Sequence, residues 1–282
     1  MKLPKISLEN STEIRDKISL LETSLSEYSF ANLYLFRKEH EYSIHHHDEL
    51  FINGINNGLM YNMPLFSLQD TKLSYIKEYI TSFGPIYPID EKDIALFDTK
   101  DFEISTNEKD WDYIYDIEKL KTYPGKKLQK KRNLLKQFIK SYTYKALPLT
   151  ENLLPEAQKI LDIWLSEVSL PKEETDYVAC KEAIALYEDL ILCGGIYYAD
   201  DEPAGFIIGE ELHDSMFVLH FAKGLRKFKG IYQYIYSSFA HIMPEKYCCF
   251  NFEQDLGNEG LKQAKSSYYP DRMLKKYLIN IK

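Results

Sequence analysis

Apolar residues follow two spacings along the chain, one typical of helices and one typical of strands. Over residues 9–28 the apolar positions Ile14, Ile18, Leu21 and Leu25 recur three or four residues apart, which predicts an amphipathic helix. The same spacing predicts further helices over residues 68–83, 126–141, 152–168, 174–192, 230–243 and 258–267. Alternating or continuous apolar stretches predict strands within residues 34–66 and over residues 111–120, 196–198, 204–210, 216–222 and 247–252.

Turn residues separate these elements and indicate the fold class. Asn56-Asn57-Gly58 stands between two strand-like stretches and predicts a hairpin. In the second half, two helices precede three strands, a glycine-bounded loop over residues 223–230, a helix, a strand and a helix. A regular βαβ alternation is missing from this order, so we expect an α/β fold with a mixed sheet rather than a doubly wound parallel sheet.

This order of elements resembles the GNAT acyltransferase fold. The resemblance implies two central strands that splay apart, an acyl donor in the gap, and a loop after the fourth strand whose backbone N–H groups cradle a pyrophosphate. In that loop's motif, Q/R-x-x-G-x-G/A, Gly230 fits, Lys227 takes the first position and the bulky Tyr232 takes the last. Tyr232 obstructs close backbone approach, which disfavours acyl-CoA bound in the usual manner. The predicted anion-binding residues of this loop are Arg226, Lys227, Lys229 and Gly230.

A short residue pattern occurs twice. Glu118 is followed by glycine seven residues on and by lysines nine and twelve residues on, and Glu253 is followed by the same residues at the same spacings. Each copy follows a strand-like stretch. We interpret the pattern as the trace of a duplication. We expect two GNAT-like domains in tandem, an N-terminal one over residues 1–150 and a C-terminal one over residues 151–282.

Composition narrows the class of protein. The 282 residues are 45% hydrophobic and 28% charged, which is normal for a folded globular protein. No run approaches the roughly 18 apolar residues that a membrane span needs, and the start, from Met1 and Lys2 to Asp16, lacks a signal-peptide pattern. No CxxC pair occurs among the four cysteines Cys180, Cys193, Cys248 and Cys249. We expect a cytoplasmic protein in a reducing compartment.

Two small clusters are interpreted as structural. His45 and His47 share a strand face but supply too few ligands for a metal site, so residues 45–48 are expected to form an exposed hairpin edge. Cys248 and Cys249 are expected in the core of a strand. No metal cofactor is predicted.

Charge is distributed unevenly. The formal net charge is −8, yet ten cations and no acid lie within residues 119–150. The like charges repel, and no acid at helical spacing compensates them. Two interpretations stay open: a solvated helix face, or an anion-binding surface for nucleotide phosphate or a tRNA backbone. The candidate residues for donor binding are Lys126, Lys127, Lys130, Lys131 and Arg132.

Polar residues alternate at the end of the strand predicted over residues 247–252. Asn251, Glu253 and Asp255 are spaced two apart, so on an extended strand their side chains share one face. Polar groups on a core-directed face need partners. Carboxylates in such a place can hold a substrate ammonium or position an amine. The alternative is a strand end that runs into a capped turn.

Two longer motifs resemble those of a known family. Residues 123–133, Tyr-Pro-Gly-Lys-Lys-Leu-Gln-Lys-Lys-Arg-Asn, resemble the Y-x-GKK-x-x-KR-N signature of soluble tandem-GNAT proteins similar to the C-terminal domain of phosphatidylglycerol lysyltransferase. Residues 251–257, with Gly260-Leu261, Lys265 and Ser267-Tyr268-Tyr269-Pro270, resemble that family's second signature. The resemblance implies two packed GNAT-like domains and transfer of an amino acid from tRNA to a hydroxyl or an amine. Bifunctional members carry an N-terminal membrane flippase, which is not expected here, and this disfavours a lipid acceptor.

We therefore expect a transferase that moves an aminoacyl or acyl group from aminoacyl-tRNA or acyl-CoA to an amine or hydroxyl of a small-molecule or peptide acceptor. Glu253 or Asp255 is expected to orient or deprotonate the nucleophile, and Tyr268 to act as a general acid near the leaving group. Asn251 and Lys265 are expected to bind substrate. Two other functions stay open: a CoA-dependent N-acetyltransferase, and a non-catalytic anion- or nucleic-acid-binding regulator with the same fold.

Overall fold

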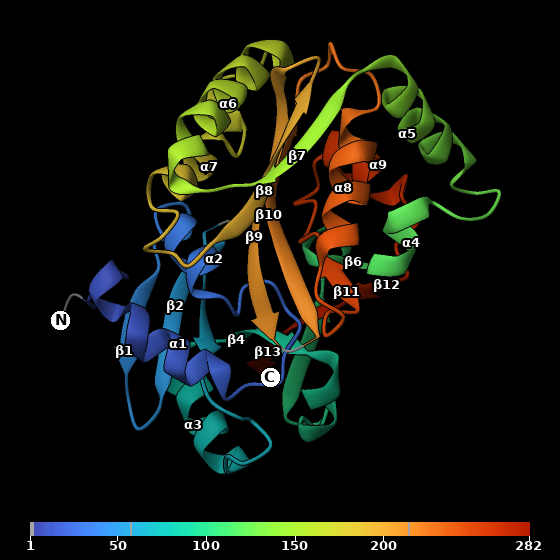
Figure 1. Ribbon diagram of the computed structural model, residues 1–282. Coiled ribbons are helices and arrows are strands. Elements are labelled where there is room, and N and C mark those ends of the chain that lie inside the picture. Colours follow the sequence, from blue (N-terminus) through green and yellow to red (C-terminus); the bar gives the residue numbers. More distant parts are fainter. Residues whose placement is uncertain (1–2, 57, 214) are drawn as a thin grey trace. The chain divides into compact units, whose positions relative to one another are not determined.

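The computed structural model describes residues 3–56, 58–213 and 215–282 (Figure 1). Outside this description lie Met1, Lys2, Asn57 and Asp214. The chain forms two compact units. Unit 1 comprises Met1–Asp112, Gln254–Asn258 and Met273–Lys282, and unit 2 comprises Tyr113–Glu253 and Glu259–Arg272. The chain therefore passes from one unit to the other four times.

Unit 1 contains a six-stranded mixed sheet. In spatial order its strands are β1 (Ser43–His46), β2 (Leu50–Asn56), β3 (Leu59–Pro64), β4 (Ile86–Asp90), β13 (Lys276–Ile281) and β5 (Phe102–Thr106). Its helices are α1 (Ser11–Ser19), α2 (Phe30–Leu35) and α3 (Leu73–Phe83), with 3-10 turns η1 (Leu8–Asn10), η2 (Glu91–Leu96) and η3 (Glu108–Asp110). The apolar face of α3 packs on this sheet, where the ring of Tyr79 stacks on Phe51 with centroids 3.6 Å apart.

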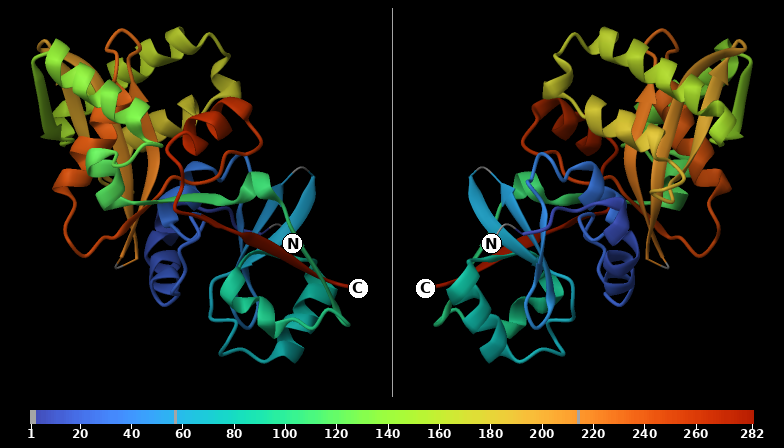
Figure 2. Two further views of the ribbon diagram at one scale, coloured as in Figure 1. Left: turned by 90° about the vertical axis from the view of Figure 1, so that its right-hand side faces the viewer. Right: turned by 90° about the vertical axis from the view of Figure 1, so that its left-hand side faces the viewer.

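Unit 2 contains the larger sheet. In spatial order its strands are β12 (Arg272–Leu274), β6 (Asp112–Asp116), β11 (Cys249–Asn251), β10 (Met216–Gly224), β9 (Glu202–His213), β8 (Cys193–Ala199) and β7 (Tyr144–Pro148). The helices and 3-10 turns are α4 (Ile117–Thr122), α5 (Gln129–Ser141), η4 (Glu151–Leu153), α6 (Leu154–Val168), η5 (Lys172–Glu174), α7 (Tyr177–Ala185), α8 (Ile231–Ile242) and α9 (Glu259–Ser266). Helices α6 and α7 lie on one side of this sheet, and α8 with α4 and α5 lies on the other (Figures 1 and 2).

The two sheets repeat one topology. In unit 1, β1–β2 and β2–β3 are antiparallel, β3–β4 is parallel and β4–β13 is antiparallel. In unit 2, the series β8, β9, β10, β11 and β6 has the same pair directions in the same order. A helix precedes the fourth strand in both, α3 before β4 and α8 before β11. The fifth strands are exchanged, since β6 follows the first repeat in sequence and β13 follows the second.

This exchange explains why the compact units differ from the expected halves, residues 1–150 and 151–282. Position 150 lies within unit 2, because β6 pairs with β11 and β7 pairs with β8, while β13 returns to β4 and β5. The Glu118 and Glu253 patterns also do not occupy equivalent places. Glu118 follows β6, the counterpart of β13, whereas Glu253 follows β11, the counterpart of β4. The repeat is visible in the strand order, not in that residue pattern.

Two predicted elements are shorter than expected. The helix expected over residues 9–28 is confined to α1. The strand expected over residues 111–120 stops at Asp116, whose carboxylate accepts the N–H of Glu118 at 2.8 Å and starts α4. The predicted hairpin is present, with Asn56 opposite Leu59 in the β2–β3 pair.

Candidate functional site

The parallel strands β10 and β11 part in the middle of the unit 2 sheet. Their pairing ends at Val218↔Asn251, and β10 continues beyond this point. On its other side, the ladder of β10 with β9 shifts register between Leu219 and Phe221. A bulge of this kind re-aims a side chain. The residue at the shift is His220.

His220 joins two carboxylates, and we call Glu210, His220 and Glu253 the Glu–His–Glu cluster. Its Nδ1 lies 2.8 Å from Glu253 Oε1, and its Nε2 lies 3.0 Å from Oε1 of Glu210 on β9. The imidazole is fully buried, whereas the side chains of Glu210 and Glu253 are 6% and 13% exposed. Burial disfavours the imidazolium, but the hydrogen bonds to both carboxylates outweigh it and raise the pKa of His220 to about 10. Of the two carboxylates, Glu253 is the more accessible.

Glu253 sits in a turn rather than in a strand. Its φ is +58°, its N–H donates to Asn251 Oδ1 at 2.6 Å, and its carbonyl accepts from Lys265 Nζ at 3.3 Å. Because β11 ends at Asn251, the alternation that predicted one shared face for Asn251, Glu253 and Asp255 does not apply. Backbone in this left-handed region is costly for a residue other than glycine and is often found at functional sites. Asn251 and Lys265 therefore fix the backbone that carries the Glu253 carboxylate.

Asp255 belongs to unit 1. The residue is 2% exposed, and its Oδ1 accepts the N–H of Gly257 at 2.8 Å. Gly257 has a φ of +75°, so Asp255 stabilises a tight turn. This arrangement matches the capped turn that was the alternative interpretation for this stretch.

Tyr268 lies in an aromatic cluster of unit 2. Its ring contacts Tyr115, Tyr123 and Tyr236, and its hydroxyl accepts from Gln233 Nε2 at 2.7 Å. Burial raises the pKa of Tyr268 well above its ordinary value. A role for Tyr268 as a general acid stays a prediction.

The basic stretch contains residues of different kinds. Lys126, Lys127 and Lys130 are exposed, and no carboxylate in the described part of the chain lies within ion-pair distance of them. Lys131 is partly buried, its Nζ donating to Ser267 Oγ at 2.7 Å over the ring of Tyr268, and burial lowers the pKa of Lys131 to about 8.

Arg132 has a different role from these lysines. Its guanidinium donates to the carbonyl oxygens of Tyr123 and Gly125. It therefore fixes the turn between α4 and α5. Anion binding by the whole set of five residues stays a prediction, and the exposed lysines are its strongest members.

The loop over residues 224–230 uses its own backbone N–H groups. Four of them donate hydrogen bonds within the protein: the N–H of Leu225 to Ala204 O, that of Arg226 to Glu167 Oε2, that of Phe228 to Leu225 O and that of Lys229 to Tyr142 Oη. Gly230 has a φ of +91°, and a Cβ there would lie 2.3 Å from Leu134 O, so packing against α5 requires glycine. Lys227 pairs with Glu202. Four N–H groups that would cradle a pyrophosphate are thus already donated within the protein.

The structure brings only some of the predicted residues together. Asn251, Glu253 and Lys265 form one group, and Lys131 and Tyr268 form another. Sequence analysis missed Glu210 and His220. Both fall in stretches predicted as apolar strands, where a charged or polar residue between apolar neighbours is the signal that could have found them.

Other expectations concern cysteines, metals and membranes. Cys248 is exposed and Cys249 half-buried, so placing both in a strand core was wrong; β11 begins only at Cys249. Within the described residues, no group of three or more His, Cys, Asp and Glu side chains is arranged to hold a metal ion. None of the helices in the described ranges is long and apolar enough to cross a membrane.

The fold and site define a class: a mixed α/β protein with two GNAT-like sheets, in which a polar cluster lies where two parallel central strands part. The chain belongs to the phosphatidylglycerol lysyltransferase C-terminal family, whose sequence pattern matches residues 18–280. Membership of this family supports a transferase of the aminoacyltransferase type.

The chain is also similar to individual proteins and solved structures. An uncharacterised protein of Mycoplasmoides gallisepticum is 28% identical over 185 residues, which are 64% of this chain and 57% of that protein, so the match spans little more than half of that relative. The structure of a conserved protein of unknown function from Bacteroides thetaiotaomicron matches with a TM-score of 0.88 at 25% identity, over all of both chains. L-PGS from Bacillus licheniformis shares the fold, with a TM-score of 0.63 at 16% identity over 99% of this chain and 93% of that chain.

Proposed function

We propose that this protein transfers an aminoacyl group from aminoacyl-tRNA to an amine or hydroxyl of a small-molecule or peptide acceptor, and that the Glu–His–Glu cluster binds the ammonium of that group. The observation that carries the proposal is the Glu253 carboxylate, held by buried His220 where β10 and β11 part. An ammonium distinguishes an aminoacyl ester from a plain acyl ester. A carboxylate that is 13% exposed at the edge of a buried polar cluster is suited to bind it.

In this reaction the protein acts mainly by positioning the acceptor and the aminoacyl ester rather than by covalent catalysis. The acceptor nitrogen or oxygen attacks the ester carbonyl carbon, and the bond between that carbon and the ribose oxygen of the tRNA breaks. The proton lost by the acceptor ends on the ribose hydroxyl. Glu253 orients the aminoacyl group. Our candidates to stabilise the oxyanion are the backbone N–H groups of β10 beyond Val218, where the pairing of β10 with β11 has ended.

The exposed lysines and the hydrogen-bonded loop after β10 favour aminoacyl-tRNA over acyl-CoA as the group donor in this proposal. Lys126, Lys127 and Lys130 are exposed cations suited to a phosphate backbone. The loop after β10 has donated four N–H groups within the protein, which weakens the case for a CoA pyrophosphate there. Roles for Lys131, Asn251 and Lys265 in substrate binding belong to the same proposal.

A thermal-shift titration tests the donor class. We expect aminoacyl-tRNA to raise the unfolding midpoint more than uncharged tRNA, and acetyl-CoA to leave it unchanged. A larger shift with acetyl-CoA would favour the N-acetyltransferase, and equal shifts with charged and uncharged tRNA would favour the non-catalytic binder. The Glu253→Gln variant should lose the larger shift with aminoacyl-tRNA. Glu259→Gln, altered at an exposed residue of α9, is its matched control.

A further inference from the structure

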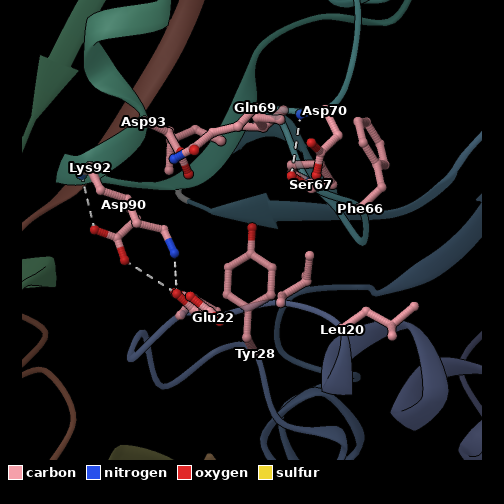
Figure 3. A pocket seen from close by; sticks show the side chains of 15 residues that line it. Leu20, Glu22, Tyr28, Phe66, Ser67, Gln69, Asp70, Asp90, Lys92 and Asp93 are labelled. Carbon is pink, nitrogen blue, oxygen red and sulfur yellow. Dashed lines mark hydrogen bonds between the residues drawn. The ribbon is translucent and has the colours of Figure 1, made fainter.

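A pocket in unit 1 and a pair of cysteines in unit 2 lie outside the Glu–His–Glu cluster. The pocket, of about 380 Å³, is formed by residues after α1, after β3 and at the end of β4 (Figure 3). Figure 3 shows Glu22 and Asp70 on opposite sides of it, so these carboxylates do not converge on one point. The cysteines Cys248 and Cys249, in contrast, bring two reactive atoms together.

Cys248 and Cys249 depart from the alternation of a regular strand. The backbone N–H groups of both residues donate to the carbonyl oxygen of Ser215, at 2.9 and 3.4 Å. Two consecutive residues thus oppose one residue of the neighbouring segment, as in a β-bulge. Adjacent side chains of a regular strand point to opposite faces. The bend at Ser215 instead lets the two sulfurs meet at the start of β11.

The two thiols are in contact and can be reached from solvent. Their Sγ atoms are 3.4 Å apart, and the Cys248 Sγ also lies 3.4 Å from the Ser215 carbonyl oxygen. Cys248 is exposed and Cys249 is half-buried. Burial, and after it the neighbouring Cys248 sulfur, raise the pKa of the Cys249 thiol to about 12, so Cys249 keeps its proton at neutral pH.

A direct disulfide between these neighbours is unfavourable. Cα atoms joined by one trans peptide bond are about 3.8 Å apart, whereas disulfides usually need about 4.4–6.8 Å. The backbone here is also held in place. The Cys248 carbonyl accepts the N–H of Ile117 at 3.0 Å, and Cys249 pairs with Met216 on one side and Asp116 on the other. The two sulfurs are therefore better placed to be bridged by a third atom than to be joined directly.

A metal ion is a poor candidate for that third atom. Structural zinc sites have four ligands, and within residues 3–56, 58–213 and 215–282 no group of three or more His, Cys, Asp and Glu side chains is arranged to hold an ion. Metals also bind thiolates, and the raised pKa of Cys249 opposes loss of its proton. The bridging centre should need only two sulfurs and should react with thiols. A trivalent arsenical with one organic group has this chemistry.

We propose that Cys248 and Cys249 form a bidentate site for a trivalent arsenical that carries one organic group. In the reaction with an arsenoxide, two As–S bonds form and the bonding between arsenic and oxygen breaks. Both thiol protons leave with that oxygen as water. Arsenic stays trivalent, so the step needs no oxidant or reductant. The site does not rest on the proposed function.

The test is a titration of the full chain with phenylarsine oxide, followed by intact mass spectrometry and a count of free thiols. We expect one adduct per chain and the loss of two of the four free thiols. Dimercaprol, a dithiol, should release the arsenical. Mercaptoethanol, a monothiol at the same concentration of thiol groups, should leave the adduct intact.

Single substitutions separate a bridge from attachment to one sulfur. Cys248→Ser and Cys249→Ser should each weaken the adduct by about 100-fold or more, because the second As–S bond forms within the molecule. Cys193→Ser, altered at another exposed cysteine, is the matched control and should react as the wild type does. Unchanged affinity in a Cys248→Ser variant that keeps its urea midpoint would overturn the proposal. Loss of only one thiol in the wild type, or Zn²⁺ bound at this pair as tightly as the arsenical, would also overturn it.

Discussion

His220 is buried between two carboxylates, and its charge depends on both of them. The hydrogen bonds to Glu210 and Glu253 keep the imidazole protonated in a place where burial alone would neutralise it. This fixed cation in turn keeps two carboxylates close together without strong repulsion. At the residue scale, the site is therefore one hydrogen-bonded unit in which an imidazolium lies between two carboxylates.

The raised pKa of His220, about 10 against an ordinary 6.5, predicts a pH dependence of stability. A raised folded-state pKa contributes stability in full below pH 6.5, and the contribution is lost as pH rises toward 10. We expect the difference in unfolding free energy between wild type and His220→Gln to shrink by on the order of a few kcal/mol across this range. Urea unfolding at several pH values measures it.

The test uses the difference in unfolding free energy between wild type and His220→Gln because Lys131 titrates in the same pH range. Burial lowers the pKa of Lys131 to about 8, so its contribution has the opposite sign and grows as pH rises. Both proteins carry Lys131, and its effect cancels in the difference. A difference that stays constant from pH 6.5 to 10 would show that His220 is not held as a cation.

The residues of the site were only partly predictable. Glu253 and Asn251 were identified from their alternation, although the structure replaces that alternation with a turn. Glu210 and His220 could not be joined from sequence alone, because their meeting depends on the register of β9 with β10 and on the bulge at His220. The basic residues within 126–132 were easier to find, since a run of like charges is visible in the sequence itself.

At the scale of elements, two residues have structural roles at the junctions between α4, α5 and α8. Arg132 closes the turn between α4 and α5, and Gly230 lets the start of α8 approach α5. Helix and strand types were largely predictable from apolar spacing. Their bounds were not, because caps such as Asp116 end a strand and start a helix within a continuous apolar pattern.

The exposed lysines and Arg132 should respond differently to mutation. Lys127→Glu with Lys130→Glu should weaken tRNA binding and reduce its dependence on salt, with little change in the urea midpoint. Arg132→Gln should instead lower stability by about 1–3 kcal/mol, because two charge-assisted hydrogen bonds are lost. Filter binding over a salt series and urea unfolding separate the two effects. Unchanged tRNA binding in the double variant would leave a solvated helix face as the interpretation.

Gly230→Ala tests the packing of α5 on α8. An added Cβ would lie 2.3 Å from Leu134 O at a φ of +91°, so we expect a loss of about 1–3 kcal/mol in unfolding free energy. Gly58→Ala provides a comparison, because Gly58 has a φ of +78° with nothing within 4 Å of the added Cβ. Equal losses in the two variants would show that backbone strain alone, not the contact with α5, accounts for the effect.

At the scale of the whole molecule, the two sheets are linked by exchanged strands. β13, from the C-terminal end, lies between β4 and β5, and β6, from the first half, lies between β11 and β12. Such non-local pairing leaves no periodic signal in the sequence. The two-sheet architecture was predictable from element order and family resemblance, but this exchange was not.

Fragments test this exchange. A fragment of residues 1–150 lacks β13, and one of residues 151–282 lacks β6, so neither should show cooperative urea unfolding alone. Mixed or co-expressed, they should restore it. Circular dichroism during the titration provides the measurement. A cooperative transition for either fragment alone would mean that the exchanged strands are dispensable.

The central claim is that Glu253, held by His220, binds the ammonium of an aminoacyl group. The most direct measurement compares the affinity of aminoacyl-tRNA with that of the same tRNA after acetylation of its amino group, which removes the charge. We expect wild type and Glu259→Gln to prefer the unacetylated form by about tenfold or more, the value of a charge-assisted hydrogen bond. In Glu253→Gln, with its urea midpoint retained, the preference should disappear. A Glu253→Gln variant that stays folded and keeps the full preference would contradict the claim.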